Sequence, residues 1–296
     1  MGELNLINDG WTFGLLKGEG AVQQLQQATE VHLPHSAVET PYNYFDDAVF
    51  HRPFLYQRML NWDPRFGGKE VSLVFDGAMA DARVYLNGQL LARHGDGYTP
   101  FEVRLTDHLD EGPNLVSVVV DGGENPDIPP FGGQIDYLTY AGIYRDVWLK
   151  VAPRISIDRV KVETFDVLEA AASASVQVNI RNPQDLVVEG VVAARLIGPN
   201  GSEVARAEVA AAEGGVMLRF ADLTRISRWT PSAPALYQVE VTLNTDQGTD
   251  RLQATFGFRT AEFTPEGFLL NGRPLKLRGL NRHQSFPYVG YALGRR

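Results

Sequence analysis

The sequence predicts an all-β protein built from packed β-sandwiches, and three observations support this prediction. Apolar and polar residues alternate over short runs such as Val176–Ile180 and Val239–Leu243, as in strands with one buried face. Asn-Gly and Asp-Gly pairs recur between these runs, and both pairs favour tight turns. Long amphipathic helical patterns are absent from the sequence. Short strands at intervals of about 8–12 residues are typical of sandwiches.

Two of the Asn-Gly pairs give the most specific local predictions. Arg83–Ala92 should form a tight hairpin around Asn87-Gly88, and Phe268–Leu277 should form another around Asn271-Gly272. The type I′ turn of such a hairpin needs a positive φ at both central residues, which Asn and Gly tolerate. Each pair therefore predicts where the chain reverses and which residues lie opposite one another.

Chain length and composition predict the division into domains. The chain has 296 residues, and one domain commonly holds about 100–200 residues. Residues 1–152 are rich in aromatic side chains and loops, whereas 153–260 hold regular runs of Ala and Val. We expect one sandwich over 1–152 and an immunoglobulin-like sandwich of about seven strands over 153–260. Residues 261–296 are too few for a domain and are expected to begin another one.

Composition excludes several classes of function. The chain has no cysteine, which excludes disulfides, zinc sites of the cysteine type and thiol nucleophiles. Its formal net charge of −9 argues against general nucleic-acid binding. No stretch approaches the roughly 18 apolar residues of a membrane span, and no signal peptide is visible. We expect no nucleic-acid partner, no membrane span and a cytoplasmic location.

The stretch Gly267–Arg296 differs in charge from the rest of the chain. It contains no Asp or Glu and has six Lys or Arg side chains. A basic arm that binds nucleic acid is one interpretation of such a stretch. The leucines between the basic residues favour another interpretation, a buried strand region whose acidic partners lie outside this chain.

Several segments together resemble glycoside hydrolase family 2, which includes the β-galactosidases, β-glucuronidases and β-mannosidases. The segments that carry the resemblance are Asp81–Gly88, His94–Phe101, Gly142–Leu149, Trp229–Pro231, Pro234–Tyr237, Phe256–Arg259, Phe268–Pro274 and Arg278–His283. They cover nearly the whole chain in the family's order. The resemblance implies a jelly-roll sugar-binding domain, an immunoglobulin-like domain and, from residue 261, the first strand region of a catalytic (β/α)8 barrel that is truncated here.

The resemblance also implies a reaction that this chain should not perform alone. Retaining glycosidases need two carboxyl groups about 5–5.5 Å apart. In the family both are glutamates on late barrel strands, and the acid/base follows an Asn, but this sequence has no Asn-Glu pair. We assign no catalytic residue here. The resemblance implies a retaining glycoside hydrolase of β-galactosidase type for the full-length protein, and an inactive fragment.

Asp136 is the first candidate for a substrate contact. It lies six residues before Gly142, and in β-galactosidases of the family an Asp at this spacing is implicated in binding the galactose 6-hydroxyl and a sodium ion. Carboxylate oxygens suit both tasks. The resemblance thus implies that Asp136 binds substrate and is a metal ligand, with Na⁺ or Mg²⁺ as the ion in the full-length enzyme. An ordinary Asx turn is the alternative.

Three further residues are candidate substrate contacts by resemblance. His283 matches the family's histidine at the end of the first barrel strand, the end that faces the active site, and Asn281 precedes it in the same motif. The family commonly has Glu after this histidine, where this chain has Gln284. Asn43 is a candidate from the first domain, with a turn-forming role as the alternative.

Other interpretations of the chain stay open at this point. Phe131, Tyr137 and Tyr140 could stack on a sugar, although packing of their loop onto the sandwich is favoured. The spacing of Asp136 favours a β-galactoside partner over a β-glucuronide, and β-glucuronidase or β-mannosidase specificity stays open as an alternative. A free-standing carbohydrate-binding module or lectin and a structural pair of adhesin-like sandwiches are the alternatives from other classes. A homo-oligomer is compatible with the resemblance.

Overall fold

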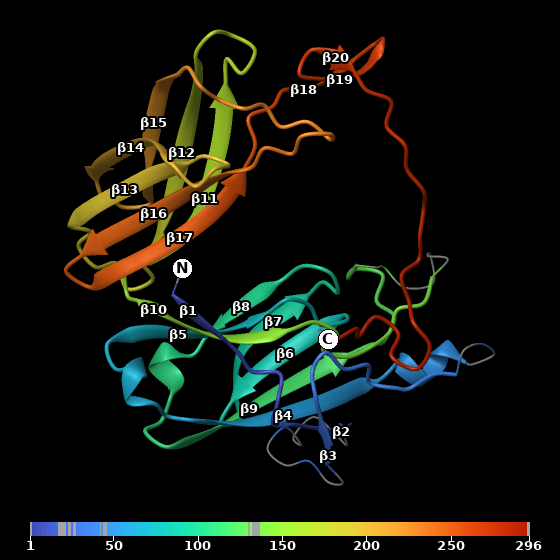
Figure 1. Cartoon of the computed structure of the whole chain (residues 1–296). Coiled ribbons are helices and arrows are strands. Elements are labelled where there is room, and N and C mark those ends of the chain that lie inside the picture. Colours follow the sequence, from blue (N-terminus) through green and yellow to red (C-terminus); the bar gives the residue numbers. More distant parts are fainter. Residues whose placement is uncertain are drawn as a thin grey trace. The chain divides into compact units, whose positions relative to one another are not determined.

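The structure is a computed structural model that describes residues 2–16, 22, 25, 28–41, 43, 46–129, 131 and 137–294. It divides into two compact units, which we describe separately (Figure 1). One unit, the jelly-roll unit, comprises Glu3–Val151 and Asn281–Arg296, and the other, the Ig-like unit, comprises Met1–Gly2 and Ala152–Leu280. The prediction of an all-β fold is confirmed, because helices among the described residues are short 3₁₀ turns such as Asp47–Phe50.

The jelly-roll unit consists of two antiparallel sheets. One sheet has six strands in the order β3-β2-β4-β9-β6-β7, and the other has four in the order β1-β10-β5-β8. The strands are β1 (Glu3–Leu6), β2 (Trp11–Leu15), β3 (Thr29–Val31), β4 (Pro53–Asn61), β5 (Lys69–Phe75), β6 (Asp81–Leu86), β7 (Gln89–Gly95), β8 (Phe101–Arg104), β9 (Pro113–Asp121) and β10 (Val147–Pro153).

The inner faces of both sheets form a continuous apolar core. Trp11, Phe54 and Phe75 are fully buried in it, and each such side chain stabilises the fold by about 1.5–3 kcal/mol. The indole Nε1 of Trp11 donates a hydrogen bond to the Ile7 carbonyl at 2.7 Å, so its polar atom is satisfied. The core therefore rests on large side chains that the strand alternation directs inward.

A histidine and a tyrosine form a polar pair within this unit. The Tyr56 hydroxyl lies 2.9 Å from His35 Nδ1, and Tyr56 is fully buried. Burial lowers the pKa of His35 to about 4 and holds the pKa of Tyr56 well above its usual range. Both groups are therefore neutral at pH 7, and the tyrosine hydroxyl can donate to the imidazole.

The Ig-like unit is a second sandwich. Its sheets have the orders β11-β12-β15 and β14-β13-β16-β17, and these seven strands match the expected number. The alternation over 176–180 is confirmed, since Val176 and Val178 are buried while Gln177 is exposed. The strands are β11 (Ser156–Phe165), β12 (Ala172–Arg181), β13 (Gly190–Ile197), β14 (Glu203–Ala210), β15 (Gly215–Leu223), β16 (Tyr237–Thr245) and β17 (Gly248–Phe256).

Both predicted hairpins form, but the second is shorter than expected. Strands β6 and β7 pair along their length around Asn87-Gly88. A small sheet of β18 (Ala261–Thr264), β19 (Gly267–Leu270) and β20 (Arg273–Pro274) forms around Asn271-Gly272, with only two residue pairs between β19 and β20. Residues 275–280 form no strand, and Leu280 is 99% exposed. In this chain they are not a buried strand, because no described strand lies beside them.

Residues 281–294, which we call the tail segment, pack on the jelly-roll unit (Figure 1). The backbone N–H of Tyr288 donates to the Thr40 carbonyl at 3.0 Å, and Ala292 is buried beside Tyr144. This unit is therefore assembled from two stretches that are far apart in the sequence. No helix in the described part of the chain is both long enough and apolar enough to cross a membrane.

Candidate functional site

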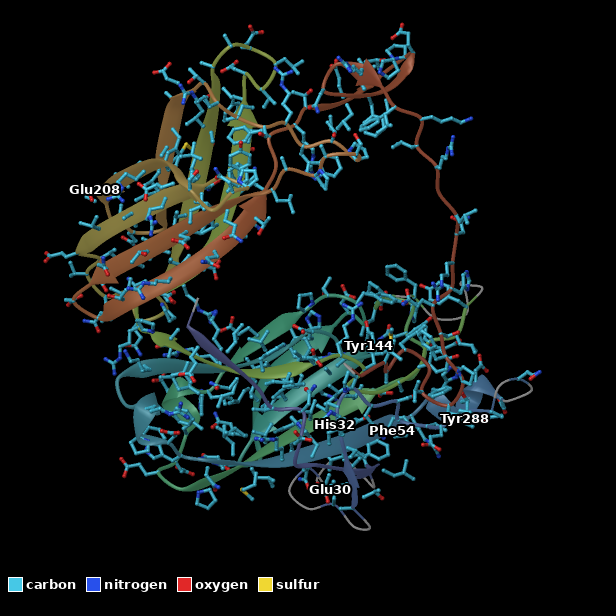
Figure 2. The ribbon with its side chains drawn as sticks, in the orientation of Figure 1. Glu30, His32, Phe54, Tyr144, Glu208 and Tyr288 are labelled. Carbon is cyan, nitrogen blue, oxygen red and sulfur yellow. The ribbon has the colours of Figure 1, made fainter. Side chains whose placement is uncertain are left out.

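A cavity of about 520 Å³ opens on the jelly-roll unit, where the tail segment meets two of its loops. We call it the tyrosine cavity. Tyr144 on its wall and Tyr288 of the tail segment are labelled in Figure 2. The residues that line it are Tyr98, Tyr137, Tyr144, Arg145, Arg282, His283, Gln284, Phe286, Tyr291 and Leu293.

The loop between β7 and β8 places two of these tyrosines. The Asp96 carboxylate accepts a hydrogen bond from the Tyr98 backbone N–H at 2.8 Å, which forms an Asx turn. Gly97 lies so close to Met79 that a β-carbon there would collide with the thioether sulfur. The Gly97 carbonyl in turn accepts a hydrogen bond from the Tyr144 hydroxyl at 2.6 Å. This Asp-Gly pair therefore holds Tyr98 and Tyr144 in the wall.

The tyrosine hydroxyls give the cavity neutral hydrogen-bonding groups. The hydroxyls of Tyr98 and Tyr137 lie 3.0 Å apart, and either can donate. Burial raises the pKa of Tyr291 to about 12. Burial, together with the Tyr137 hydroxyl, holds the pKa of Tyr98 well above its usual range. The hydroxyls of Tyr98 and Tyr291 therefore stay protonated at neutral pH, where they can both donate and accept.

Two arginines give the wall positive charge. Arg145 donates to the carbonyls of Tyr98 at 3.1 Å and Asp76 at 3.3 Å, and its guanidinium lies 5.1 Å from the centre of the Tyr144 ring. Arg282 is exposed. None of the described lining residues carries a carboxylate. The arrangement suits binding of a ligand with several hydroxyls or a negative charge, and it offers no pair of carboxyl groups for acid/base chemistry.

The structure brings one of the four candidate site residues to the cavity. His283 lines it, and its ring meets the Tyr137 ring edge-on with the centroids 5.6 Å apart. Asn281 is exposed two residues earlier and is not part of the wall, and exposed Asn43 does not line it either. Asp136 lies outside the described residues.

The described residues do not form a metal site of the usual kind. No three His, Asp or Glu side chains among them come together as ligands would. The sodium or magnesium ion, and the role of Asp136 as its ligand, therefore stay predictions from the resemblance, and we assign no chemistry to an ion here.

Sequence reasoning did not single out most of the cavity wall. Tyr98 and Tyr144 lie in segments that carry the family resemblance, so their presence there was a usable signal. Tyr291 had no such signal. Tyr140 is buried, with its ring 5.3 Å from that of Phe50 and 4.8 Å from that of Tyr291. Tyr140 therefore packs the loop onto the sandwich, as the favoured interpretation expected, whereas Tyr137 lines the cavity and Phe131 is 49% exposed.

A second cavity, of about 620 Å³, lies in the Ig-like unit. It is formed by the loops beside Asn200, Asp222 and Thr224, and buried Tyr237 lines its floor. The Tyr237 hydroxyl already accepts a hydrogen bond from the Ser227 backbone N–H at 2.7 Å. No candidate site residue lies in this cavity, so the tyrosine cavity is the candidate functional site.

Two family models match the chain, one for each unit. The model for the sugar binding domain of glycosyl hydrolases family 2 matches residues 5–153. A second model of glycosyl hydrolases family 2 matches residues 155–259. Together the two matches extend over nearly all of the two sandwiches.

Individual proteins resemble the whole chain. It is 46% identical to a β-galactosidase of Rhizobium meliloti, over 100% of this chain and 39% of that protein. It is 40% identical to a β-galactosidase of Thermoanaerobacterium thermosulfurigenes, over 98% of this chain and 42% of that protein. The crystal structure of a Bacteroides uniformis β-glucuronidase matches with a TM-score of 0.84 at 30% identity, over 99% of this chain and 37% of that one. The chain thus spans about two fifths of the length of these relatives.

Proposed function

Since the chain belongs to family 2 of the glycosyl hydrolases, we propose that it supplies part of the sugar-binding pocket of a β-galactoside-hydrolysing enzyme. The observation that carries this proposal is the position of His283. The histidine of the Arg278–His283 motif lies in the wall of a cavity that is otherwise built mainly from aromatic rings and hydroxyl groups. The volume of about 520 Å³ is in the range of small-molecule sites.

The chemistry of the wall suits a sugar. A pyranose presents hydroxyl groups at its edge and C–H groups on its faces. The rings of Tyr137 and Phe286 offer apolar surface, while tyrosine hydroxyls, an amide and the His283 imidazole can bond to hydroxyls. In this proposal His283 donates or accepts one hydrogen bond to the ligand and transfers no proton.

A β-glucuronide is the second candidate ligand, and the two arginines favour it. Guanidinium groups pair well with carboxylates, and Arg145 and Arg282 lie in a wall whose described residues include no acid. The names of the two relatives at 46% and 40% identity support the galactoside instead. Arg145 also already bonds two backbone carbonyls, which explains its presence without an acidic ligand.

We further propose that hydrolysis needs residues beyond those of this chain. Retaining hydrolysis requires two carboxyl groups about 5–5.5 Å apart. The described wall offers no carboxylate, and the sequence lacks the Asn-Glu pair that the resemblance implies for the acid/base. In this proposal the chain binds the sugar, and the acid/base and the nucleophile come from elsewhere in a longer protein.

A titration followed by NMR tests the proposal. Methyl β-galactoside, β-glucuronide and β-mannoside are each added to the chain, and the His283 ring signal is followed. We expect the galactoside alone to shift it, with a Kd in the millimolar range, because one or two hydrogen bonds contribute only about 0.5–3 kcal/mol. The sugar should stay intact throughout. A shift only with the glucuronide would favour the second candidate, and a micromolar Kd would favour a lectin.

Two variants sharpen this titration. His283→Ala should weaken galactoside binding, read from the Tyr137 ring signal because the variant lacks the His283 signal. Asp136→Ala should weaken it too if that carboxylate holds the 6-hydroxyl. A methyl α-L-arabinoside, which lacks that hydroxymethyl group, should bind wild type and Asp136→Ala equally. Equal losses for both sugars would mean that Asp136 shapes its loop and does not contact the ligand.

A further inference from the structure

We propose that Gly290 and Tyr291 form an anchor that positions His283 in the tyrosine cavity. The role of this anchor in sugar binding rests on the proposed function of His283. The test of the anchor itself needs no sugar and is independent of that function. Within the described residues, Lys276–Ser285 forms no strand and no backbone hydrogen bond. The position of His283 therefore has to be set by residues on its C-terminal side.

The residues from Phe286 onward are held tightly. Phe286 and Gly290 exchange backbone hydrogen bonds at 2.9 and 3.0 Å, which closes a turn, and Tyr288 bonds to Thr40. Two residues lie between His283 and Phe286, so the two are three steps apart along the chain, and an extended chain spans at most about 3.3–3.6 Å per step. The imidazole is thereby tethered within about 10 Å of the turn.

Only glycine lets this turn lie where it does. Gly290 has a φ of +56°, and a β-carbon there would come within 2.5 Å of Cγ of the Tyr140 ring. That ring is buried against Phe50 and cannot move away easily. The turn therefore rests directly on an aromatic side chain of the jelly-roll core.

Tyr291 adds a contact with the stretch that also faces His283. Its ring packs 4.8 Å from that of Tyr140, and its hydroxyl donates to the Leu138 carbonyl at 2.7 Å. Leu138 directly follows Tyr137, the residue whose ring meets His283. The anchor contacts Leu138 and Tyr140, and the histidine contacts the adjacent Tyr137. Both are thus held by one short stretch, and we expect loss of the anchor to free the histidine.

The test is an alanine series on the glycines of this region. Gly290→Ala introduces the colliding β-carbon, whereas Gly279→Ala and Gly294→Ala meet no atom within 4 Å and serve as matched controls. The readout is the NOE between the ring protons of His283 and Tyr137 in protein with labelled His and Tyr. The His283→Gln variant assigns the signal, and the signal of His35, which bonds to the buried Tyr56, reports whether the jelly-roll unit is folded.

We expect Gly290→Ala to abolish the NOE and both controls to keep it at wild-type intensity. Should the His35 signal show that Gly290→Ala is unfolded, Tyr291→Phe takes its place. That variant removes one hydroxyl and should reduce the NOE at least twofold. A wild-type NOE in either folded anchor variant would overturn the proposal, and so would loss of the NOE in a control.

The same samples separate this inference from the proposed function. With the NOE lost, galactoside binding should weaken by about threefold to tenfold, the effect of one hydrogen bond. If the NOE is lost but binding is unchanged, the anchor does position His283, and the proposed sugar contact of His283 is wrong.

Discussion

Each unit has one of the two predicted Asn-Gly hairpins. The two hairpins have turns of the same kind but differ in the length of the strands that the turns connect. Asn87 and Asn271 both have a φ of 50°. Asn87 exchanges backbone and side-chain hydrogen bonds with Leu115, donating through its N–H at 2.9 Å and accepting at Oδ1 at 2.8 Å. Asn271 makes the same two bonds with Thr260, both at 3.0 Å. Each asparagine thus joins the turn to a neighbouring segment.

Beyond the turn the hairpins diverge. Strands β6 and β7 pair over six residue pairs inside a six-stranded sheet, and Val84 and Leu86 are buried. Strands β19 and β20 pair over two, and Leu277 and Leu280 are exposed. Turn residues thus decide where a chain reverses, whereas the length of the strands depends on neighbours that cover their apolar faces.

Truncating a leucine should change the free energy of unfolding far more in the first hairpin than after the second. Leu86→Ala should lower the free energy of unfolding of the jelly-roll unit by about 2–5 kcal/mol, because it leaves a cavity in the core. Leu280→Ala should change stability by less than about 0.5 kcal/mol, because the side chain is exposed. Each loss is measured by urea titration with hydrogen exchange in the unit that holds the residue: β9 amides report Leu86→Ala, and β16 amides report Leu280→Ala. Equal losses would mean that Leu280 is covered after all.

The contrast between local turn signals and the neighbours that strands need explains how much of the fold could be predicted. Alternation and turn pairs are local signals, and they identified the buried face of β12 and both reversals. The leucines at 275, 277 and 280 look equally strand-like in the sequence, yet they form no strand. A strand needs a partner, and a single segment carries no information about whether one lies beside it.

The candidate site likewise contains residues that a local motif predicted and residues that only tertiary packing brings together. His283 was found because a local motif carries the resemblance, and it does line a cavity. Tyr98 also lies in a segment that carries the resemblance but was not singled out, and Tyr291 lies in none; the two meet only through the packing of a loop and the tail segment. Asn281 and Asn43, chosen by the same resemblance, do not line the cavity. A motif therefore indicates a neighbourhood, and tertiary packing decides which of its side chains form the wall.

Acid should destabilise the jelly-roll unit, which holds the first hairpin, more than the Ig-like unit, which holds the second. Burial lowers the pKa of His35 in the jelly-roll unit to about 4, so the unfolded chain binds this proton more readily than the folded one. Neutral His35 therefore contributes fully to the stability of the jelly-roll unit above pH 6.5, and this contribution is lost as the pH falls from 6.5 towards 4. Allowing for partial exposure of His35, we expect a loss of about 2 kcal/mol. Urea titrations across this pH range measure it.

Each unit provides one control for this prediction. His35→Gln should flatten the pH dependence of the jelly-roll unit between pH 6.5 and 4, at the cost of some stability at pH 7. In the Ig-like unit, hydrogen bonds from Arg206 and Arg195 lower the pKa of Glu203 to about 2, so this ion-pair network stays charged over that range. A wild-type pH slope in the His35→Gln variant would assign the effect to another group.

The smallest effect concerns the turn itself, and here the hairpins should behave alike. Asn87→Gly and Asn271→Gly both keep the positive φ but remove the Oδ1 acceptor of one backbone N–H, that of Leu115 or of Thr260. They also remove the Nδ2 donor, which bonds to Asp110 and Asn114 in the first hairpin and to the Trp229 carbonyl in the second. Loss of one such bond costs about 1 kcal/mol, so each amide should exchange about fivefold faster.

Asp substitutions at the same two positions retain the acceptor oxygen and the tolerance of positive φ and lose only the Nδ2 donor. Asn271→Asp should leave the Thr260 exchange rate close to that of the wild type, whereas Asn87→Asp places a carboxylate beside that of Asp110 and should exchange somewhat faster at Leu115. A similar acceleration at Leu115 and Thr260 in the Gly variants would mean that the turn contributes the same free energy in a long and a short hairpin. If only the Leu115 amide responds, the bond from Asn271 depends on strand neighbours as well, and the turn is not an independent unit of either hairpin.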